Sequence, residues 1–77
     1  SDPEAQRRGD RLKVWRRREA SRRGVPLQVV LPVVAMRYLQ RHGAVDLQSV
    51  PQLGPKRIER YGRQLEEVCQ SRAVERT

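Results

Sequence analysis

The sequence has one cysteine, Cys69, and one histidine, His42, among its 77 residues. A single cysteine cannot form a disulfide within the chain, and with one histidine it cannot complete a Cys/His metal cage. We therefore predict no metal site and no cofactor. The scarcity of thiols also fits a reducing compartment, so we expect a cytoplasmic protein.

Long apolar runs and clustered carboxylates are missing as well. No stretch approaches the roughly 18 residues of a membrane span, and the N-terminus lacks a signal pattern, so no membrane partner is predicted. Asp and Glu are scattered singly or beside Arg, without a spacing that supports metal-dependent or nucleophilic catalysis. A chain this short buries only about 60% of the surface of its unfolded form, which argues against a deep catalytic cleft. We predict a domain that is not an enzyme by itself.

Basic residues are abundant. The chain carries 17 Lys and Arg, almost all of them Arg, against 9 Asp and Glu, for a formal net charge of +8. Nine of the basic residues lie between Arg7 and Arg23, where the only acidic residues are Asp10 and Glu19. Polyanions are the natural partners of such a surface.

The spacing of apolar residues predicts an all-α fold, a compact bundle of four to five short helices. A first helix over 10–23 is capped by Asp10 and stopped by Gly24. Residues 26–31 (PLQVVL) could be read locally as a strand, but no second strand pattern is present to pair with them, so we expect an extended or single-turn segment. Further helices are expected from Pro32 to Gly43, briefly after Asp46, and from Pro55 to Cys69.

These signals set the expected boundaries. Residues 1–9 have little apolar content and are interpreted as a linker or a remnant of cloning, residues 10–71 as the helical domain, and residues 72–77 as a tail. One domain of this size is expected to be a monomer in isolation.

Read in order, many of these residues resemble the HRDC domain, the helicase and RNase D C-terminal module. The resemblance covers about Leu12 to Cys69, and its most specific parts are the Val25–Leu31 segment and the run Lys56–Gly62. The residues that carry it are Trp15, Arg16, Ala20, Gly24, Val25, Pro26, Val29, Val30, Leu31, Met36, Leu47, Val50, Gly54, Ile58, Glu59, Arg60, Tyr61, Gly62 and Leu65. The second run is most like that of bacterial RecQ-type DNA helicases, which implies an accessory domain of an ATP-dependent helicase that acts in DNA repair and recombination in the bacterial nucleoid.

Three positions depart from that pattern. Gln28 stands where several relatives have an aromatic residue that can stack on an unpaired base, a contact that contributes roughly 1 to 3 kcal/mol. Gln52 replaces the first glycine of the Gly-x-Gly that often precedes the last helix, which argues against a backbone phosphate cradle. Leu31 and Pro32 replace the usual polar cap, so the helix after them is expected to have no side-chain acceptor at its start.

Candidate nucleic-acid contacts fall in two groups. If Leu12, Trp15 and Glu19–Ala20 face inward, five basic side chains lie on the flanks and outer side of the first helix. These residues are Arg11, Lys13, Arg17, Arg18 and Arg22. Alternatively, the same charges form a solvated face that keeps the domain soluble. Arg16 is expected to be structural, with an acidic partner.

The second group is Lys56 and Arg57 at the start of the last helix, where free backbone N–H groups also favour a phosphate. Arg60 is a weaker candidate for the same group. The alternative is that these cations pair with nearby Glu residues of the same helix. Tyr38 is out of phase with its apolar neighbours and is a weak stacking candidate, whereas Trp15 and Tyr61 are expected in the core.

Three functions follow as hypotheses. The first is an auxiliary module of a RecQ-like helicase that binds single-stranded or branched DNA weakly and helps to position or select it. The second is an interaction module that docks on an acidic surface of its own helicase core or of a partner protein. The third is a domain that positions RNA for an RNase D-like exonuclease.

Overall fold

The computed structural model describes residues 2–70, and this part of the chain contains helices and no strand. Its elements are α1 (Pro3–Arg23), α2 (Leu27–Val30), α3 (Val33–His42), the 3-10 helix η1 (Leu47–Ser49) and α4 (Gly54–Cys69). The predicted all-α bundle is therefore confirmed. Ser1 and the expected tail at 72–77 lie outside the described residues.

Helix α1 begins seven residues earlier than expected. Asp2 is its N-cap, and the Asp2 carboxylate accepts a hydrogen bond from the amide of Glu4 at 3.0 Å, while Pro3 occupies the first helical position. The start expected at Asp10 is wrong, and residues 3–9, expected as a linker, form the first two turns of the helix. The predicted stop is confirmed, because Gly24 adopts the left-handed conformation at φ 67° and its amide returns to Ala20 and Ser21.

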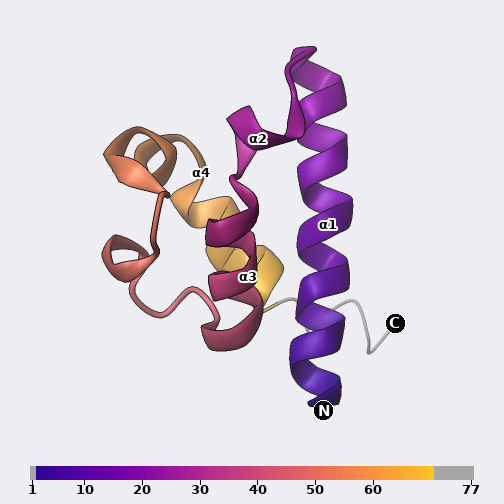
Figure 1. The fold of residues 1–77 in the computed structure, drawn as a ribbon, viewed down its shortest axis with the longest axis vertical. Helices are drawn as coiled ribbons and strands as arrows, with labels where there is room; N and C mark the ends of the chain where they lie inside the picture. Colours follow the sequence, from indigo (N-terminus) through magenta and orange to yellow (C-terminus); the bar gives the residue numbers. More distant parts are fainter. Residues whose placement is uncertain (1, 71–77) are drawn as a thin grey trace.

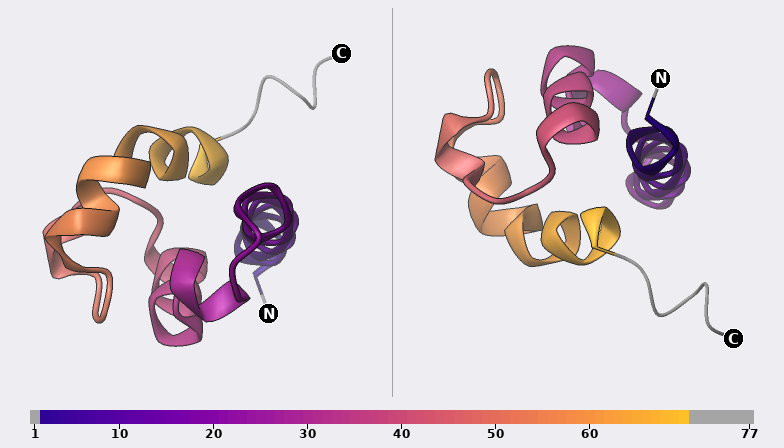
Figure 2. Two further views of the ribbon diagram at one scale, coloured as in Figure 1. Left: turned by 90° about the horizontal axis from the view of Figure 1, so that it is seen from above. Right: turned by 90° about the horizontal axis from the view of Figure 1, so that it is seen from below.

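Helix α1 is the spine of the molecule. Its 21 residues span about 31 Å, the length of the longest molecular axis, which is also 31 Å. Helices α2, α3 and α4 all pack against one side of α1 (Figure 1). In the view along α1, helices α3 and α4 lie apart from each other, and α1 lies beside the ends of both (Figure 2). Among residues 2–70, no other helix lies on the opposite side of α1.

The core lies between α1 and the other helices and is built mainly of aliphatic side chains. Its largest fully buried members are Leu12, Val30, Leu31, Leu39, Leu53, Tyr61 and Leu65. Trp15 is half-buried against this cluster, and Cys69 at the end of α4 is buried. The inner faces predicted for the first and last helices are thus confirmed.

Helices α1 and α3 approach each other closely at Gly9. Gly9 is buried, and a Cβ built at this position would lie 2.5 Å from the side chain of Gln40 on α3. A residue with a Cβ at this position would force the end of the Gln40 side chain to move, so Gly9 lets the two helices approach with Gln40 where it is. Gly62 plays the same part in α4, where a Cβ would lie 3.3 Å from Leu47 of η1.

The segment between α1 and α3 is a single helical turn, α2, as one of the two expected forms. Its residue Gln28 caps the next helix. The Gln28 Oε1 atom accepts a hydrogen bond from the amide of Val33, the first residue of α3, at 2.9 Å. As expected, the N-cap residue Pro32 offers no side-chain acceptor, and the acceptor comes instead from five residues before Val33, across the α2 turn.

The turn before α4 keeps a glycine-like backbone without the first glycine. Gln52 has φ 64°, in the left-handed region that costs a residue with a Cβ roughly 1 to 2 kcal/mol. Gly54 follows at φ 83° and begins α4. Gln52 therefore places a residue with a Cβ in a conformation that favours glycine, which adds backbone strain to this turn.

Candidate nucleic-acid interface

Several arginines close the ends of helices rather than face solvent. Arg8 donates to the carbonyl of Gln40 near the end of α3. Arg11 donates from Nε to the carbonyl of Val68 at 2.8 Å and from Nη2 to that of Cys69 at 3.1 Å, at the end of α4. The last carbonyls of a helix have no partner within it, so these guanidinium groups satisfy them from α1.

Arg16 belongs to the same set. Its Nε donates to the carbonyl of Leu31 at 2.8 Å, and its Nη2 donates to Gln28 Oε1 at 3.0 Å. The structural role expected for Arg16 is present, but its partners are a carbonyl and an amide, so the acidic partner expected for it is wrong. Partial burial lowers the pKa of Arg16, and the group still carries its charge at neutral pH.

Arg57 ties the start of α4 to α2. It donates to the carbonyl of Val29 from Nε and to that of Leu53 from Nη1, both at 3.1 Å. Longer contacts of 3.4 Å reach the carbonyls of Gln28 and Gln52. A planar guanidinium can serve several acceptors at once, whereas an ammonium cannot hold this geometry. The half-buried Arg57 is therefore part of the fold.

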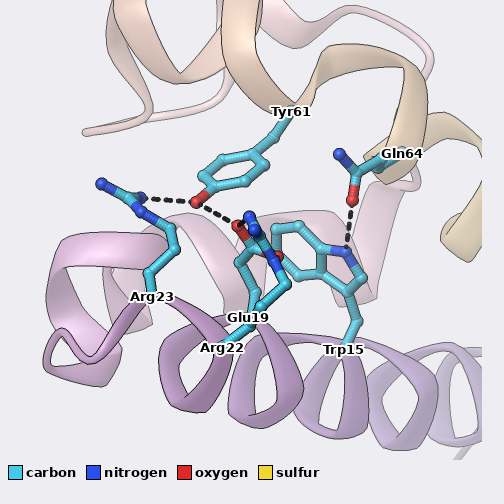
Figure 3. A network of polar contacts seen from close by, with 6 residues as sticks. All are labelled: Trp15, Glu19, Arg22, Arg23, Tyr61 and Gln64. Atoms are coloured by element: carbon cyan, nitrogen blue, oxygen red, sulfur yellow. Dashed lines mark hydrogen bonds and ion pairs between the residues drawn. The ribbon is translucent and has the colours of Figure 1, made fainter.

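A second polar network joins the end of α1 to α4 (Figure 3). Glu19 is buried at 7% exposure, and both of its oxygens accept hydrogen bonds from Arg22, at 3.0 and 2.5 Å. The hydroxyl of Tyr61 donates to Glu19 Oε2 at 3.0 Å and accepts from Arg23 Nη1 at 2.6 Å. The hydrogen bonds from Arg22 lower the pKa of Glu19, against an opposing effect of burial, and Tyr61 adds to the lowering.

The network shares its tyrosine with the aromatic core. Trp15 and Tyr61 meet edge to face, with ring centroids 5.0 Å apart and an interplanar angle of 89°. The indole of Trp15 donates to Gln64 Oε1 at 3.0 Å. Both aromatic rings are thus held by packing on one side and by a hydrogen bond at the polar tip. The assignment of Tyr61 to the core is confirmed, whereas Trp15 packs against the edge of the core and is half-buried.

Three of the cations that the fold does not use lie on the flanks and outer side of α1. Lys13, Arg17 and Arg18 are exposed, and within residues 2–70 no hydrogen bond or ion pair occupies them. We call these three residues the α1 stripe. Arg17 and Arg18 border a shallow surface hollow together with Val14, Ser21 and Arg22. Arg22 is exposed too, but its charge is paired with Glu19, which raises the pKa of Arg22.

A separate hollow lies where the end of α1, α2 and the start of α4 meet. Its lining consists of Arg23, Val29, Lys56, Arg57, Arg60 and Tyr61. We call it the α1–α4 hollow. Four of the six lining residues are cationic and none is acidic. Lys56 and Arg60 are exposed, and the part of the chain that the structure describes offers them no hydrogen-bond or ion-pair partner.

The predicted binding residues are therefore divided by the fold. Arg17 borders one hollow with Lys13 and another with Arg18, and Lys56 lies with Arg57 in the α1–α4 hollow. Arg11, Arg22 and Arg57 hold main-chain or carboxylate acceptors, and their assignment to nucleic acid stays a prediction. Tyr38 is half-buried with its ring 4.5 Å from that of His42, so one face of this stacking candidate is covered.

Arg23 was missed by sequence reasoning. It lies in the last turn of α1, on the side that faces α4, and the bond to Tyr61 places it in the hollow. The signal that could have identified it is its spacing, since it lies four residues after Glu19 on the inner side of the helix.

Other chemistry is not apparent in the described residues. Within 2–70, no group of three or more His, Cys, Asp or Glu side chains is placed to hold a metal ion. None of the helices there is both long and apolar enough to cross a membrane. Burial raises the pKa of the Cys69 thiol, which opposes formation of a reactive thiolate.

Comparison with known proteins identifies one family. The HRDC domain family matches residues 5–69, which is most of the chain and begins inside the first turn of α1. Neither the curated proteins nor the solved structures include a significant match.

Proposed function

The chain belongs to the HRDC domain family, whose members are non-catalytic accessory modules that bind nucleic acid or other domains, and we propose that it is a weak, electrostatic DNA-binding module of a RecQ-like DNA helicase. In that role it helps to position single-stranded or branched DNA for the motor. The proposed setting is the cytoplasm of a bacterium, close to the nucleoid. The resemblance of Lys56–Gly62 to RecQ-type helicases supports the choice of parent.

The observation that carries the proposal is the α1 stripe. The fold uses Arg8, Arg11, Arg16 and Arg57 to satisfy carbonyls, yet it leaves Lys13, Arg17 and Arg18 exposed on α1, without a hydrogen bond or ion pair within residues 2–70. Phosphates of a nucleic acid would neutralise them and release counterions.

The proposed affinity is low for two reasons. A stripe of three cations contacts few phosphates, and Gln28 does not provide the aromatic platform on which a base would stack. For single strands, each phosphate neutralised contributes about 0.7 to the slope of log affinity against log salt. Three contacts predict a slope near −2, so binding should weaken steeply as salt rises.

The test is fluorescence anisotropy with a labelled single-stranded oligonucleotide over a salt series, for the wild type and for Arg17→Ala/Arg18→Ala. We expect the double variant to bind more weakly and to lose about 1.4 from the slope. Arg37→Ala/Arg41→Ala is the matched control, because it removes the same charge from exposed positions on α3. Equal weakening by both pairs would mean that net charge alone, and not the stripe, attracts the strand.

A docking function is the second candidate, and exposed apolar residues favour it. Leu27 and Val29 of α2 are 43% and 44% exposed, and Leu27 lines a small hollow with Lys13, Arg16 and Arg17. Apolar side chains beside cations suit an acidic protein surface. Leu27→Ser should then abolish association with a helicase core lacking this domain and leave DNA binding unchanged.

An RNA oligonucleotide of the same sequence tests the third hypothesis, since preference for RNA would favour an exonuclease parent.

A further inference from the structure

The α1–α4 hollow differs from the α1 stripe in how its cations are held. Arg23 is fixed by the Tyr61 hydroxyl, which is in turn fixed by the buried carboxylate of Glu19. Arg57 is fixed by carbonyls of α2 and of the turn before α4. Two guanidinium groups from different elements are thus oriented into one concave place before any ligand arrives, which lowers the ordering cost of binding.

The remaining two cations have no such explanation within the fold. Lys56 and Arg60 lie one helical turn apart on α4 and border the same hollow as Arg23 and Arg57. Lys56 also lies in the first turn of α4, which contains no acidic residue. A cation there opposes the helix dipole, which favours negative charge at this end. Residues that destabilise the fold locally are expected at functional sites, so the position of Lys56 indicates a role in ligand binding.

The charge of the hollow indicates the kind of anion. Four cations and no carboxylate line it, together with the exposed side chain of Val29 and the ring of Tyr61. An internal phosphodiester brings one negative charge, whereas a phosphate monoester at a strand end brings about 1.5 to 2 and three acceptor oxygens. The monoester matches the clustered charge better, because it can engage several cations at one point.

We propose that the α1–α4 hollow binds the terminal phosphate of a nucleic-acid strand, through Arg23, Lys56 and Arg60, beside the Val29 side chain. Arg57 and the Glu19–Tyr61 pair act as positioning residues that shape the hollow and orient Arg23. The inference rests on the proposed DNA-binding function and deepens it, since it makes the domain a reader of strand ends in addition to a basic surface. Both 5′ and 3′ phosphates have the required chemistry.

The experiment compares three internally labelled single-stranded oligonucleotides of one sequence, with a 5′ phosphate, a 3′ phosphate, or hydroxyls at both ends. Anisotropy at pH 7.5 is measured for the wild type, for Lys56→Gln/Arg60→Gln and for Arg17→Ala/Arg18→Ala. We expect the wild type to prefer one phosphorylated end by about tenfold, near the lower end of what one hydrogen bond to a charged group contributes. The Lys56→Gln/Arg60→Gln variant should lose this preference, while Arg17→Ala/Arg18→Ala should weaken all three oligonucleotides and keep it.

Each outcome separates the two proposals. Equal affinity of the wild type for all three oligonucleotides would overturn the strand-end inference and leave the DNA-binding function standing, whereas binding of none would overturn both. A preference that survives in Lys56→Gln/Arg60→Gln would also overturn the inference, because the hollow would not be its source. The second phosphate pKa is about 6, so a true monoester preference should decrease at pH 5.5. Circular dichroism should show that both variants, altered only at exposed residues, remain folded.

Discussion

Gln28 and Val33 are joined across the α2 turn, with the side-chain oxygen of Gln28 accepting the amide of Val33 at 2.9 Å. The same oxygen accepts from Arg16 of α1 at 3.0 Å. One exposed glutamine therefore connects three helices, and the position at which relatives can stack a base is here used to start α3.

Replacing Gln28 tests this role. Gln28→Ala removes the cap of α3 and one partner of Arg16, and we expect it to lower the free energy of unfolding by about 0.5 to 2 kcal/mol. Urea denaturation followed by circular dichroism measures the change. Gln48→Ala, at an exposed position of η1, is the control and should have little effect. If both substitutions behaved alike, the bond to Val33 would contribute nothing measurable.

Arg57 and Arg60 offer a test of which cations belong to the fold. Arg57→Ala leaves carbonyls of α2 and of the turn before α4 without their hydrogen-bond donor, and should destabilise the domain by about 1 to 3 kcal/mol. Arg57→Lys should recover little of this, since an ammonium cannot replace the fork. Arg60→Ala changes an exposed residue and is expected within about 0.5 kcal/mol of the wild type. A thermal melt of each variant decides the comparison, and an unaltered Arg57→Ala melt would contradict it.

Glu19 predicts a loss of stability in acid. Hydrogen bonds from Arg22, and further from Tyr61, lower the pKa of this carboxyl in the folded state from its ordinary value of 4.5. A lowered folded-state pKa stabilises the domain fully at pH values above 4.5, and this contribution is lost as the pH falls through the folded-state value. The free energy of unfolding, measured by urea between pH 7 and pH 3, should therefore fall more for the wild type than for Glu19→Gln.

The comparison with Tyr61→Phe refines that experiment. This variant keeps the pair with Arg22 but removes one donor to Glu19, so its acid loss should be smaller than that of the wild type and larger than that of Glu19→Gln. A difference between wild type and Glu19→Gln that stayed constant over the whole pH range would show that Glu19 does not titrate differently on folding.

Lys56 is expected to lower the stability of the domain and to favour binding of a terminal phosphate. Lys56→Glu places a negative charge in the first turn of α4, where the helix dipole favours it, and should raise the free energy of unfolding by about 0.3 to 1 kcal/mol at low salt. The same change should abolish the preference for a terminal phosphate. Lys56→Gln is expected to lie between the two proteins in a thermal melt. A melting temperature below that of the wild type would contradict the argument from the dipole.

Much of the fold follows from local signals in the sequence. The apolar spacing of Leu12, Tyr61 and Leu65 predicts the buried faces, and Gly24 and Gly43 predict helix ends, because these features depend on nearby residues alone. The start of α1 was misplaced because Asp2 and Pro3 carry a start signal in a stretch poor in apolar residues. In the protein this stretch also lies against α3, where Gly9 faces Gln40, and the sequence does not reveal that contact.

The candidate site was harder to predict because an arginine can either face solvent or hydrogen-bond to main-chain carbonyls within the fold. Counting charge cannot separate Arg17, which is exposed, from Arg11 and Arg16, which hold carbonyls of segments distant in the chain. Nor does spacing along α1 reveal that Arg23 meets Tyr61, 38 residues later. Helical periodicity places a side chain on a face, but only the packing of the helices shows what that face meets.

The length of α1 also limits how many nucleotides of a strand the domain can contact. Lys13 and Arg23 are ten residues apart on one uninterrupted helix, which is about 15 Å along its axis. At a rise of about 3.4 Å per nucleotide in a stacked strand, that length matches about four nucleotides, close to the smallest sites of single-strand binding folds. A strand whose end occupies the hollow would leave the domain within a few nucleotides, so most of its length would stay available to a neighbouring motor.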